Sequence, residues 1–292
     1  MHKGIDTCAK ISTAAATQLK AEGFDFVARY LVPESGTLAS KALTRAEAKR
    51  ISVAGLRILA VWETTGTRAK GGAEAGLADG ARAAALAKAM EIPAGAVIYF
   101  AIDYDARSTS DLALIGAYLR AARSKTGDYE VGVYGTYLVV TTISYNTPVT
   151  GYWQCVGGSG GAVSPLAQTY QALGQDAPEC VALAKRLGFA VDIDYCLDMD
   201  AAGMWRYKED AEMTDQQIYE AVQRYADTLP VPDWARDELD EAIDLGITDG
   251  SRPTQLVPRY QAAILAKRAV RAALRESNPM DEKTLSGLLT DD

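Results

Sequence analysis

Two kinds of hydrophobic pattern alternate along the chain through about residue 200. Short apolar runs typical of buried strands are followed by longer stretches in which apolar residues recur every three or four positions, as on one face of a helix. Eight runs are strand-like: Lys3–Thr7, Phe24–Leu31, Arg57–Glu63, Ala96–Asp105, Tyr129–Gly135, Gly151–Val156, Leu166–Gln171 and Phe189–Tyr195. This alternation predicts a largely parallel sheet whose strands are connected by helices.

Capping residues place several of the helices. Ser12 precedes a helical stretch that ends near Glu22, and Thr44 with Glu47 has the spacing of a capping box. Two further helices are expected over residues 72–90 and 110–125. Eight strands with intervening helices predict an α/β fold, a (β/α)8 TIM-like barrel. The alternative is an open doubly wound sheet, but no GxGxxG follows the first strand and polar residues end many strands rather than a few.

The pattern changes after Trp205. A capping box at Thr214 begins a new helix, and Pro230 and Pro232 mark a boundary before two further helical stretches. Residues 206–292 hold 11 Lys and Arg against 18 Asp and Glu, whereas the rest of the chain is nearly neutral. We therefore expect a barrel over 1–205, a helical linker over 206–232, and a small helical C-terminal domain over 233–292 that ends in a disordered tail.

The composition argues against nucleic acid as a binding partner and against a membrane span. The net charge of −8 disfavours nucleic acid, which needs a basic surface. No apolar run approaches the ~20 residues of a membrane span. The chain begins directly with a strand-like run rather than a signal peptide, so we expect synthesis in the cytoplasm and another exit route for any action outside it.

Histidine and cysteine usage narrows the chemistry. The only histidine, His2, lies at the terminus, so a Ser-His-Asp, Cys-His or zinc hydrolase has no internal imidazole to use. The four cysteines have no CxxC spacing, and we expect buried free thiols. The alternative is a disulfide between Cys8 and Cys196, which would end neighbouring strands of the barrel. Carboxylates are the main acid/base groups that remain.

In a barrel of this class, function lies at the carboxyl ends of the strands. We expect four acids there to form the catalytic set, namely Asp6, Glu63, Asp103 and Asp105. Asp103 and Asp105 are two apart and so share one face of their strand, which we expect to be the inner face because Phe100 and Ile102 suit the helix layer. The substrate-binding set comprises Arg29, Tyr99, Tyr134, Trp153, Gln154, Gln168, Tyr170, Asp192 and Asp194.

A cup of carboxylates rimmed by aromatic rings suits glycoside hydrolysis. One acid protonates the departing oxygen, while another stabilises the oxocarbenium-like centre or activates water. Crowded carboxylates help because like charges raise one pKa and keep that group protonated. Two alternatives remain: each acid could instead cap a helix or pair with Arg29, or the acids could hold Mg²⁺ or Ca²⁺. We expect no metal and no cofactor.

Several short motifs, in order, carry a resemblance to a known family. They are Gly4-Ile-Asp-Thr-Cys8, Phe26-Val-Ala-Arg-Tyr30, Leu43-Thr-Arg-Ala-Glu-Ala48, Ala54-Gly-Leu56, Ile98-Tyr-Phe-Ala-Ile-Asp103, Val131-Gly-Val-Tyr-Gly135, Tyr152-Trp-Gln154 and Val191-Asp192. Together they resemble the glycoside-hydrolase-like barrel of phage endolysins and actinobacterial envelope proteins, which is similar to Chalaropsis-type lysozymes.

The resemblance implies a phage or prophage endolysin that hydrolyses the glycan strand of bacterial peptidoglycan, made in the host cytoplasm and released by a holin. It places the active-site acids at Asp6, Asp103 and Asp105. The lysozyme pattern is Asp-x-Glu, however, whereas this chain has Asp103-Tyr104-Asp105, so Glu63 is the alternative proton donor. A non-catalytic barrel that binds cell-wall carbohydrate is the alternative function.

The C-terminal region carries a second likeness. Asp233-Trp-Ala-Arg236, Ala242-Ile-Asp-Leu-Gly-Ile-Thr-Asp-Gly-Ser-Arg-Pro253 and Arg259-Tyr-Gln-Ala-Ala263 resemble a single surface-layer-homology-like repeat. Such a repeat implies binding to a cell-wall polymer, with Trp234, Arg252 and Arg259 as candidate contacts, or self-association. A plain helical dimerisation module is the alternative.

Overall fold

The computed structural model describes residues 1–145, 147–157, 159–207, 215–251, 253–254 and 259–277. The chain divides into two compact units, residues 1–209 and 210–292. The sequence predicts a disordered tail over residues 277–292, but Ser277 instead ends a helix, and the rest of this tail and Arg252 lie outside the described residues.

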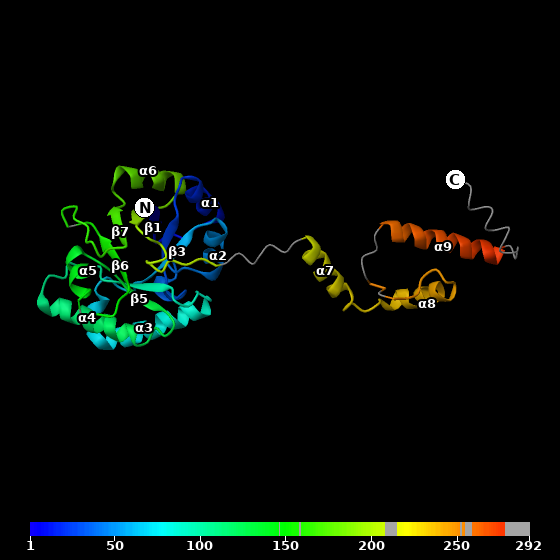
Figure 1. Cartoon of the computed structure of the whole chain (residues 1–292), viewed down its shortest axis with the longest axis horizontal. Coiled ribbons are helices and arrows are strands. Elements are labelled where there is room, and N and C mark those ends of the chain that lie inside the picture. The colour runs from blue at the N-terminus through cyan, green and yellow to red at the C-terminus, as the bar shows by residue number, and fades with distance from the viewer. Residues whose placement is uncertain (146, 158, 208–214, 252, 255–258, 278–292) are drawn as a thin grey trace. The chain divides into compact units, whose positions relative to one another are not determined.

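The first unit is a closed barrel of eight strands that neighbour one another in chain order (Figure 1). The strands are β1 (His2–Asp6), β2 (Phe26–Tyr30), β3 (Arg57–Trp62), β4 (Val97–Ala101), β5 (Glu130–Gly135), β6 (Gly151–Cys155), β7 (Thr169–Leu173) and β8 (Asp192–Cys196). The predicted TIM-like barrel is confirmed, and the open doubly wound sheet is not the fold of this chain.

Helices separate most of the strands. They are α1 (Thr13–Ala21), α2 (Arg45–Val53), α3 (Gly72–Ala89), α4 (Thr109–Arg123), α5 (Tyr137–Ile143) and α6 (Pro178–Leu187). Among the residues described, no helix lies between β6 and β7. The hydroxyl of Thr44 accepts from the Glu47 amide at 3.1 Å, as a cap should. The Glu47 side chain does not complete the capping box, because it is buried against Arg29 instead.

The direction of β8 differs from the prediction of eight parallel strands. β8 runs antiparallel to both β7 and β1, while the other neighbouring pairs are parallel. Asp192 therefore begins its strand rather than ending it, yet it lies opposite Asp6 at the carboxyl end of β1. The same reversal places Cys196 opposite His2, at the other end of the barrel from Cys8. The alternative disulfide is wrong, and both thiols are free.

Residues alternate between two cores along each strand. On β4, Tyr99 and Ala101 belong to the barrel interior, whereas Ile98 and Phe100 pack in the layer between the sheet and the helices. Ile102 continues the outer series. The expectation that Phe100 and Ile102 face the helices is confirmed.

Large side chains fill the barrel interior away from the carboxyl ends of the parallel strands. Tyr99 is fully buried and donates its hydroxyl to the carbonyl of Ala202 at 2.9 Å. Its ring occupies the space beside two glycines, since a Cβ on Gly132 or Gly151 would come within 2.6 Å of Tyr99. The barrel is thus a packed core with its open space at the carboxyl ends of the strands.

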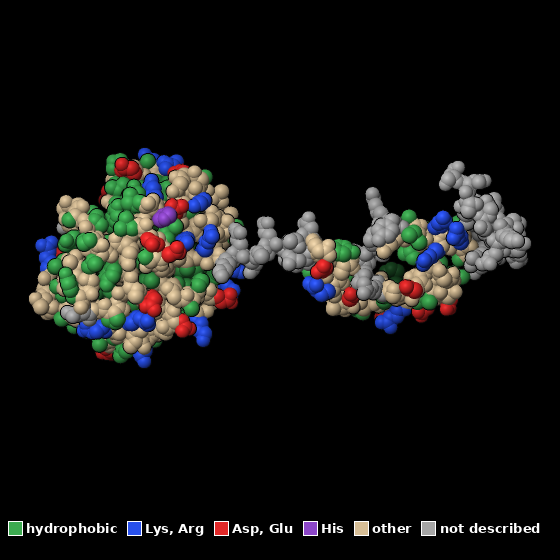
Figure 2. All heavy atoms as spheres, viewed as in Figure 1, with side chains coloured by type: hydrophobic (Ala, Val, Ile, Leu, Met, Phe, Trp, Pro, Cys, Tyr) green, Lys and Arg blue, Asp and Glu red, His purple; other side chains and the backbone are tan. Residues whose placement is uncertain are grey.

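The segment after β8 closes the opposite end of the barrel. The backbone of Trp205 exchanges two hydrogen bonds with Ile58, and the carbonyl of Gly203 accepts from Val97. His2 lies at the same end, with its Nδ1 3.0 Å from an oxygen of Asp25, and its side chain is visible on the surface in Figure 2. The only imidazole of the chain is therefore remote from the carboxyl ends of the strands.

The second unit is helical throughout its regular structure, as predicted. It contains α7 (Asp215–Ala226), the short η3 (Asp233–Ala235), α8 (Arg236–Asp244) and α9 (Arg259–Ser277). Trp234, a residue of the surface-layer-like motif, is 80% exposed. Among the described helices of the chain, none is both long and apolar enough to cross a membrane.

Candidate active site

A cavity of about 290 Å³ opens at the carboxyl ends of the parallel strands. Every strand of the barrel contributes to its wall, and we call it the acidic cup. Its lining residues are Asp6, Tyr30, Val61, Glu63, Ala101, Asp103, Tyr134, Trp153, Cys155, Gln171 and Asp192.

One amide organises the acids on one side of the cup. Nε2 of Gln171 donates to Oδ2 of Asp6 at 2.8 Å and to Oδ2 of Asp192 at 3.0 Å. The hydroxyl of Tyr134 donates to Oε1 of the same glutamine at 2.9 Å. Because Oε1 already faces a donor, the amide presents its NH₂ group to the two carboxyls.

Asp6 is the acid that holds a proton near neutrality. Burial, and then the negative charge of Asp192, raise the pKa of Asp6 from 3.8 to about 7. The hydrogen bond from Gln171 acts in the opposite direction, because it stabilises the ionised form. An acid with this pKa can donate a proton at the pH of most cells.

Asp194 lies behind Asp6 and is completely buried. Burial, and then the charge of Asp6, raise the pKa of Asp194 well above 3.8. Its Oδ1 accepts from Nε1 of Trp153 at 2.8 Å, whereas Oδ2 has no donor among the described residues. A charge on this buried oxygen beside another acid is costly, so the neutral form of Asp194 is favoured.

Glu63 and Asp103 stand on another side of the cup. Nζ of Lys41 lies 3.4 Å from Oε2 of Glu63 and 4.3 Å from the centre of the Tyr30 ring. The loop after β3 holds Asp103, whose amide donates to the carbonyl of Gly66 at 3.1 Å. A Cβ at Gly66 would come within 2.9 Å of the Asp103 carbonyl oxygen, so this close approach requires glycine.

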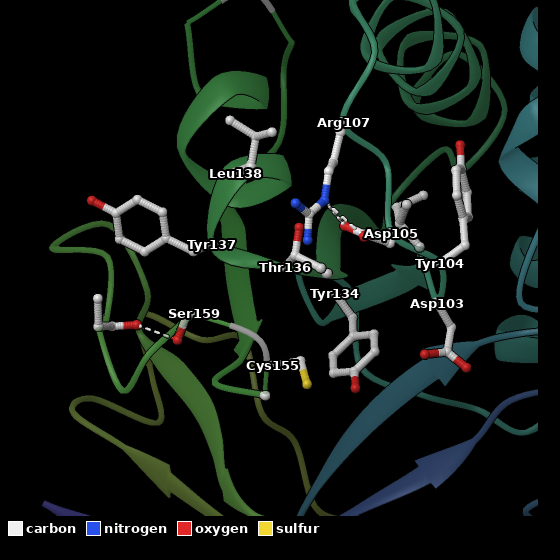
Figure 3. A pocket seen from close by; sticks show the side chains of 14 residues that line it. Asp103, Tyr104, Asp105, Arg107, Tyr134, Thr136, Tyr137, Leu138, Cys155 and Ser159 are labelled. Atoms are coloured by element: carbon white, nitrogen blue, oxygen red, sulfur yellow. Dashed lines mark hydrogen bonds and ion pairs between the residues drawn. The ribbon is translucent and has the colours of Figure 1, made fainter.

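Asp105 does not join the other three catalytic candidates. β4 ends at Ala101, and the chain turns before Asp105, whose side chain is 65% exposed. Its carboxylate accepts from Nε of Arg107 at 2.7 and 2.8 Å, away from Asp103 (Figure 3). The expectation that Asp103 and Asp105 share one inward face is wrong, because the strand does not extend far enough to keep the alternation.

A larger cavity of about 830 Å³ adjoins the acidic cup, and we call it the outer groove. The two share Asp103, Tyr134 and Cys155, so they lie side by side. Figure 3 shows Arg107, Tyr137 and Leu138 around this groove.

The geometry of the acids does not support metal binding. Within the part of the chain that the structure describes, no three His, Cys, Asp or Glu side chains are grouped so that they could hold a metal ion.

Comparison with known proteins identifies the family of the barrel. Residues 17–172, just over half of the chain, match the family model described as an Rv2525c-like, glycoside hydrolase-like domain. The chain belongs to this family. The glycoside-hydrolase-like part of the resemblance seen in the motifs is therefore confirmed. The matched span contains Glu63, Asp103 and Gln171, while Asp6 and Asp192 lie on either side of it.

Solved structures share the fold of this Rv2525c-like domain. The Mycobacterium tuberculosis Tat-secreted protein Rv2525c, crystallised in complex with L-tartrate, is 25% identical with a TM-score of 0.59, over 70% of this chain and 98% of that one. An uncharacterized B. stearothermophilus protein is 20% identical with a TM-score of 0.52, over 70% of this chain and 100% of that one, which shows the fold alone.

A curated relative matches over a shorter span. The uncharacterized protein FadG of Bacillus subtilis is 32% identical over 108 residues, which are 36% of this chain and 19% of that protein. The chain thus covers about a fifth of the length of this relative.

Besides Asp194, which lies behind Asp6, five residues of the predicted binding set lie outside the lining of the acidic cup. Arg29 is fully buried in an ion pair with Glu47 and donates to the carbonyl of Thr7. Tyr99 is fully buried in the barrel interior and does not line the cup. The side-chain amide of Gln154 is hydrogen-bonded to the backbone of Ala162 and Ser164, and that of Gln168 to the backbone of Thr150 and Tyr152. The ring of Tyr170 packs on Tyr195.

Five cup residues were missing from the predicted site: the apolar Val61 and Ala101, and Tyr30, Gln171 and Cys155, which carry polar groups. On β2 the prediction chose Arg29 although the inward residue is its neighbour Tyr30, and on β7 it chose Gln168 and Tyr170 although Gln171 faces inward. Adjacent residues on a strand point to opposite faces, so an error of one position exchanges the two sides. The two-residue spacing of Trp153 and Cys155 was the signal that could have found the cysteine.

Proposed function

We propose that this Rv2525c-like barrel is a lysozyme-like glycoside hydrolase that cleaves the glycan strand of bacterial peptidoglycan by carboxylate acid catalysis. The observation that carries the proposal is Asp6, an acid with a pKa of about 7, placed in one cup with Glu63 and Asp103. A protonated acid and further carboxylates around one cavity are what glycoside hydrolysis requires.

In the proposed reaction, Asp6 donates its proton to the glycosidic oxygen as the bond from this oxygen to the anomeric carbon breaks. Glu63 or Asp103 stabilises the positive charge that develops at the anomeric carbon, or activates the water that attacks it. The water oxygen forms the new bond, and a carboxylate takes the released proton. Asp192 and Asp194 do not touch the sugar in this scheme; burial and the charge of Asp192 keep Asp6 protonated.

The dimensions of the cup suit a single sugar unit of a longer substrate. Its volume of about 290 Å³ is at the lower end of that of ligand pockets, and its aromatic wall includes Tyr30, Tyr134 and Trp153. The rings of Tyr134 and Trp153 pack at 4.6 Å between centroids, which holds this wall rigid.

The biological setting is proposed from the motifs. We infer an endolysin of phage or prophage origin, made in the host cytoplasm and released to the wall by a holin. The surface-layer-like motif of the second unit supports a role in attaching the protein to a cell-wall polymer or in self-association, and its exposed Trp234 is available for such a contact.

One observation favours a second candidate, a non-catalytic barrel that binds cell-wall carbohydrate. The Asp-x-Glu pattern of the lysozymes is replaced by Asp103-Tyr104-Asp105, and Asp105 is paired with Arg107 outside the cup. If catalysis needs a long carboxylic acid at that position, the cup would bind sugar without cleaving it.

Purified cell walls distinguish the two candidates. Under the hydrolase proposal, the protein lowers the turbidity of the suspension and releases new reducing ends, and Asp6→Asn abolishes both while Asp128→Asn, an exposed substitution outside the cup, does not. Lysis that releases new amine ends without reducing sugar would contradict glycan cleavage. Sedimentation with the walls without any release would favour the binding barrel.

A further inference from the structure

The outer groove has a different chemistry from the acidic cup. The cup presents several carboxylates and no cation among its described lining residues, whereas the groove combines the guanidinium of Arg107 and the carboxylates of Asp103 and Asp105 with apolar and aromatic surface (Figure 3). Tyr137 and Leu138, at the start of α5, are 37% and 41% exposed, which is unusual for large apolar side chains in a concave site.

Arg107 is the cationic group of the groove. Asp105 contacts only its Nε, and neither Nη group has a partner among the described residues. The guanidinium side chain is 77% exposed, so its two free nitrogens face the hollow (Figure 3). Two Nη groups in one plane match the two oxygens of a carboxylate.

Two hydroxyl groups of the groove are already used within the protein, whereas that of Tyr104 has no partner among the described residues. Thr136 accepts from the amide of Val139 as a helix cap, and Ser159 donates to backbone carbonyls of its own loop. A ligand with small aliphatic groups and a carboxylate would be matched both by the apolar wall and by Arg107.

We propose that the outer groove binds the peptide stem of peptidoglycan, a short peptide of small aliphatic residues with a free carboxylate that Arg107 holds. The inference rests on the proposed function, since the cup would hold the sugar that carries this peptide. The shared wall of Asp103, Tyr134 and Cys155 places the two hollows side by side, as a branched glycan–peptide ligand requires. Through this groove the protein binds glycan that carries peptide in preference to bare polysaccharide.

Titration calorimetry on the full chain tests this assignment with three matched ligands. They are a peptidoglycan disaccharide with its peptide stem, the same disaccharide without the peptide, and the disaccharide-peptide with its carboxylates amidated. We expect the first to bind at least tenfold more tightly than the other two, because a charge-assisted bidentate pair is among the stronger hydrogen-bonded contacts.

Variants then locate the effect. Arg107→Met should reduce the preference for the free peptide carboxylate to less than twofold, and Asp105→Asn/Arg107→Met should do the same without leaving an unpaired carboxylate. Arg82→Met, on the exposed face of α3, should keep the preference. Equal affinity of the wild type for all three ligands, or an unchanged preference in Arg107→Met, overturns the assignment. Tight binding of the disaccharide-peptide with no release of reducing ends would reject the hydrolase proposal and leave the groove assignment standing.

Discussion

Asp6 and Asp192 lie opposite each other in the antiparallel pairing of β1 and β8, and a single nitrogen, Nε2 of Gln171, donates to both. Two carboxyls in such an arrangement do not ionise independently, because each negative charge opposes the other. Burial is the main cause of the raised pKa of Asp6, and the second acid that the reversal of β8 places beside it raises this pKa further.

The stability of the barrel should fall as the pH rises from about 4 to about 7. The pKa of Asp6 rises from 3.8 to about 7 on folding, so in this window the folded state binds more protons than the unfolded state, and the free energy of unfolding decreases with pH. Such a shift corresponds to on the order of 4 kcal/mol. Urea unfolding at pH 5 and pH 8 measures it. Asp6→Asn should flatten the dependence, whereas Asp128→Asn should not; equal slopes in wild type and Asp6→Asn would refute the assignment.

Gln171→Leu should move the alkaline limit of glycan cleavage to higher pH. The amide stabilises ionised Asp6, so its removal raises the pKa of Asp6 further, and the proton donor stays protonated over a wider range. We expect the limit to shift upward by about one pH unit together with a loss of activity, since Asp6 loses its orienting contact. Rates of reducing-end release between pH 5 and 9 provide the measurement. Gln168→Leu removes an amide of similar bonding outside the cup and should leave the limit in place.

The buried pair of Arg29 and Glu47 should matter for stability. Both side chains are fully enclosed, and Arg29 also donates to Thr7 in the loop that follows Asp6. Glu47→Gln leaves the guanidinium without a full counter-charge, which typically lowers the free energy of unfolding by about 3–5 kcal/mol. Glu91→Gln breaks a comparable pair with Arg45 at the surface and should change it by less than about 1 kcal/mol. Thermal and urea unfolding compare the two; similar effects would show that burial does not decide the difference.

Removal of the second unit should separate wall attachment from chemistry. A chain that ends at residue 209 retains the whole of the first compact unit. We expect this barrel to fold and to cleave small soluble glycan fragments at the full rate, while its activity on intact walls falls because the local concentration is lost. Circular dichroism and the two activity assays, performed in parallel with the full chain, provide the comparison. Equal clearance of whole walls by both chains would remove the anchoring role.

The sequence by itself determined the barrel and most of its acids. Eight apolar runs with intervening helical patterns require a sheet covered by helices, because each run is too short and too apolar to lie exposed. Within this framework Asp6, Glu63 and Asp103 had to come to the ends of their strands, and the structure brings all three into one cup.

Only the tertiary structure decided which way β8 runs and which neighbour on a strand faces inward. Strand direction depends on the connection that precedes the strand, and an apolar run reads the same whether it runs parallel or antiparallel. Arg29 and Tyr30 both end β2, yet only the tyrosine reaches the cup, because Glu47 on α2 provides a buried partner for the arginine on the other face. The prediction for Asp105 failed for a similar reason. β4 ends at Ala101 because of its pairing with β3 and β5, and no local pattern of residues records this pairing.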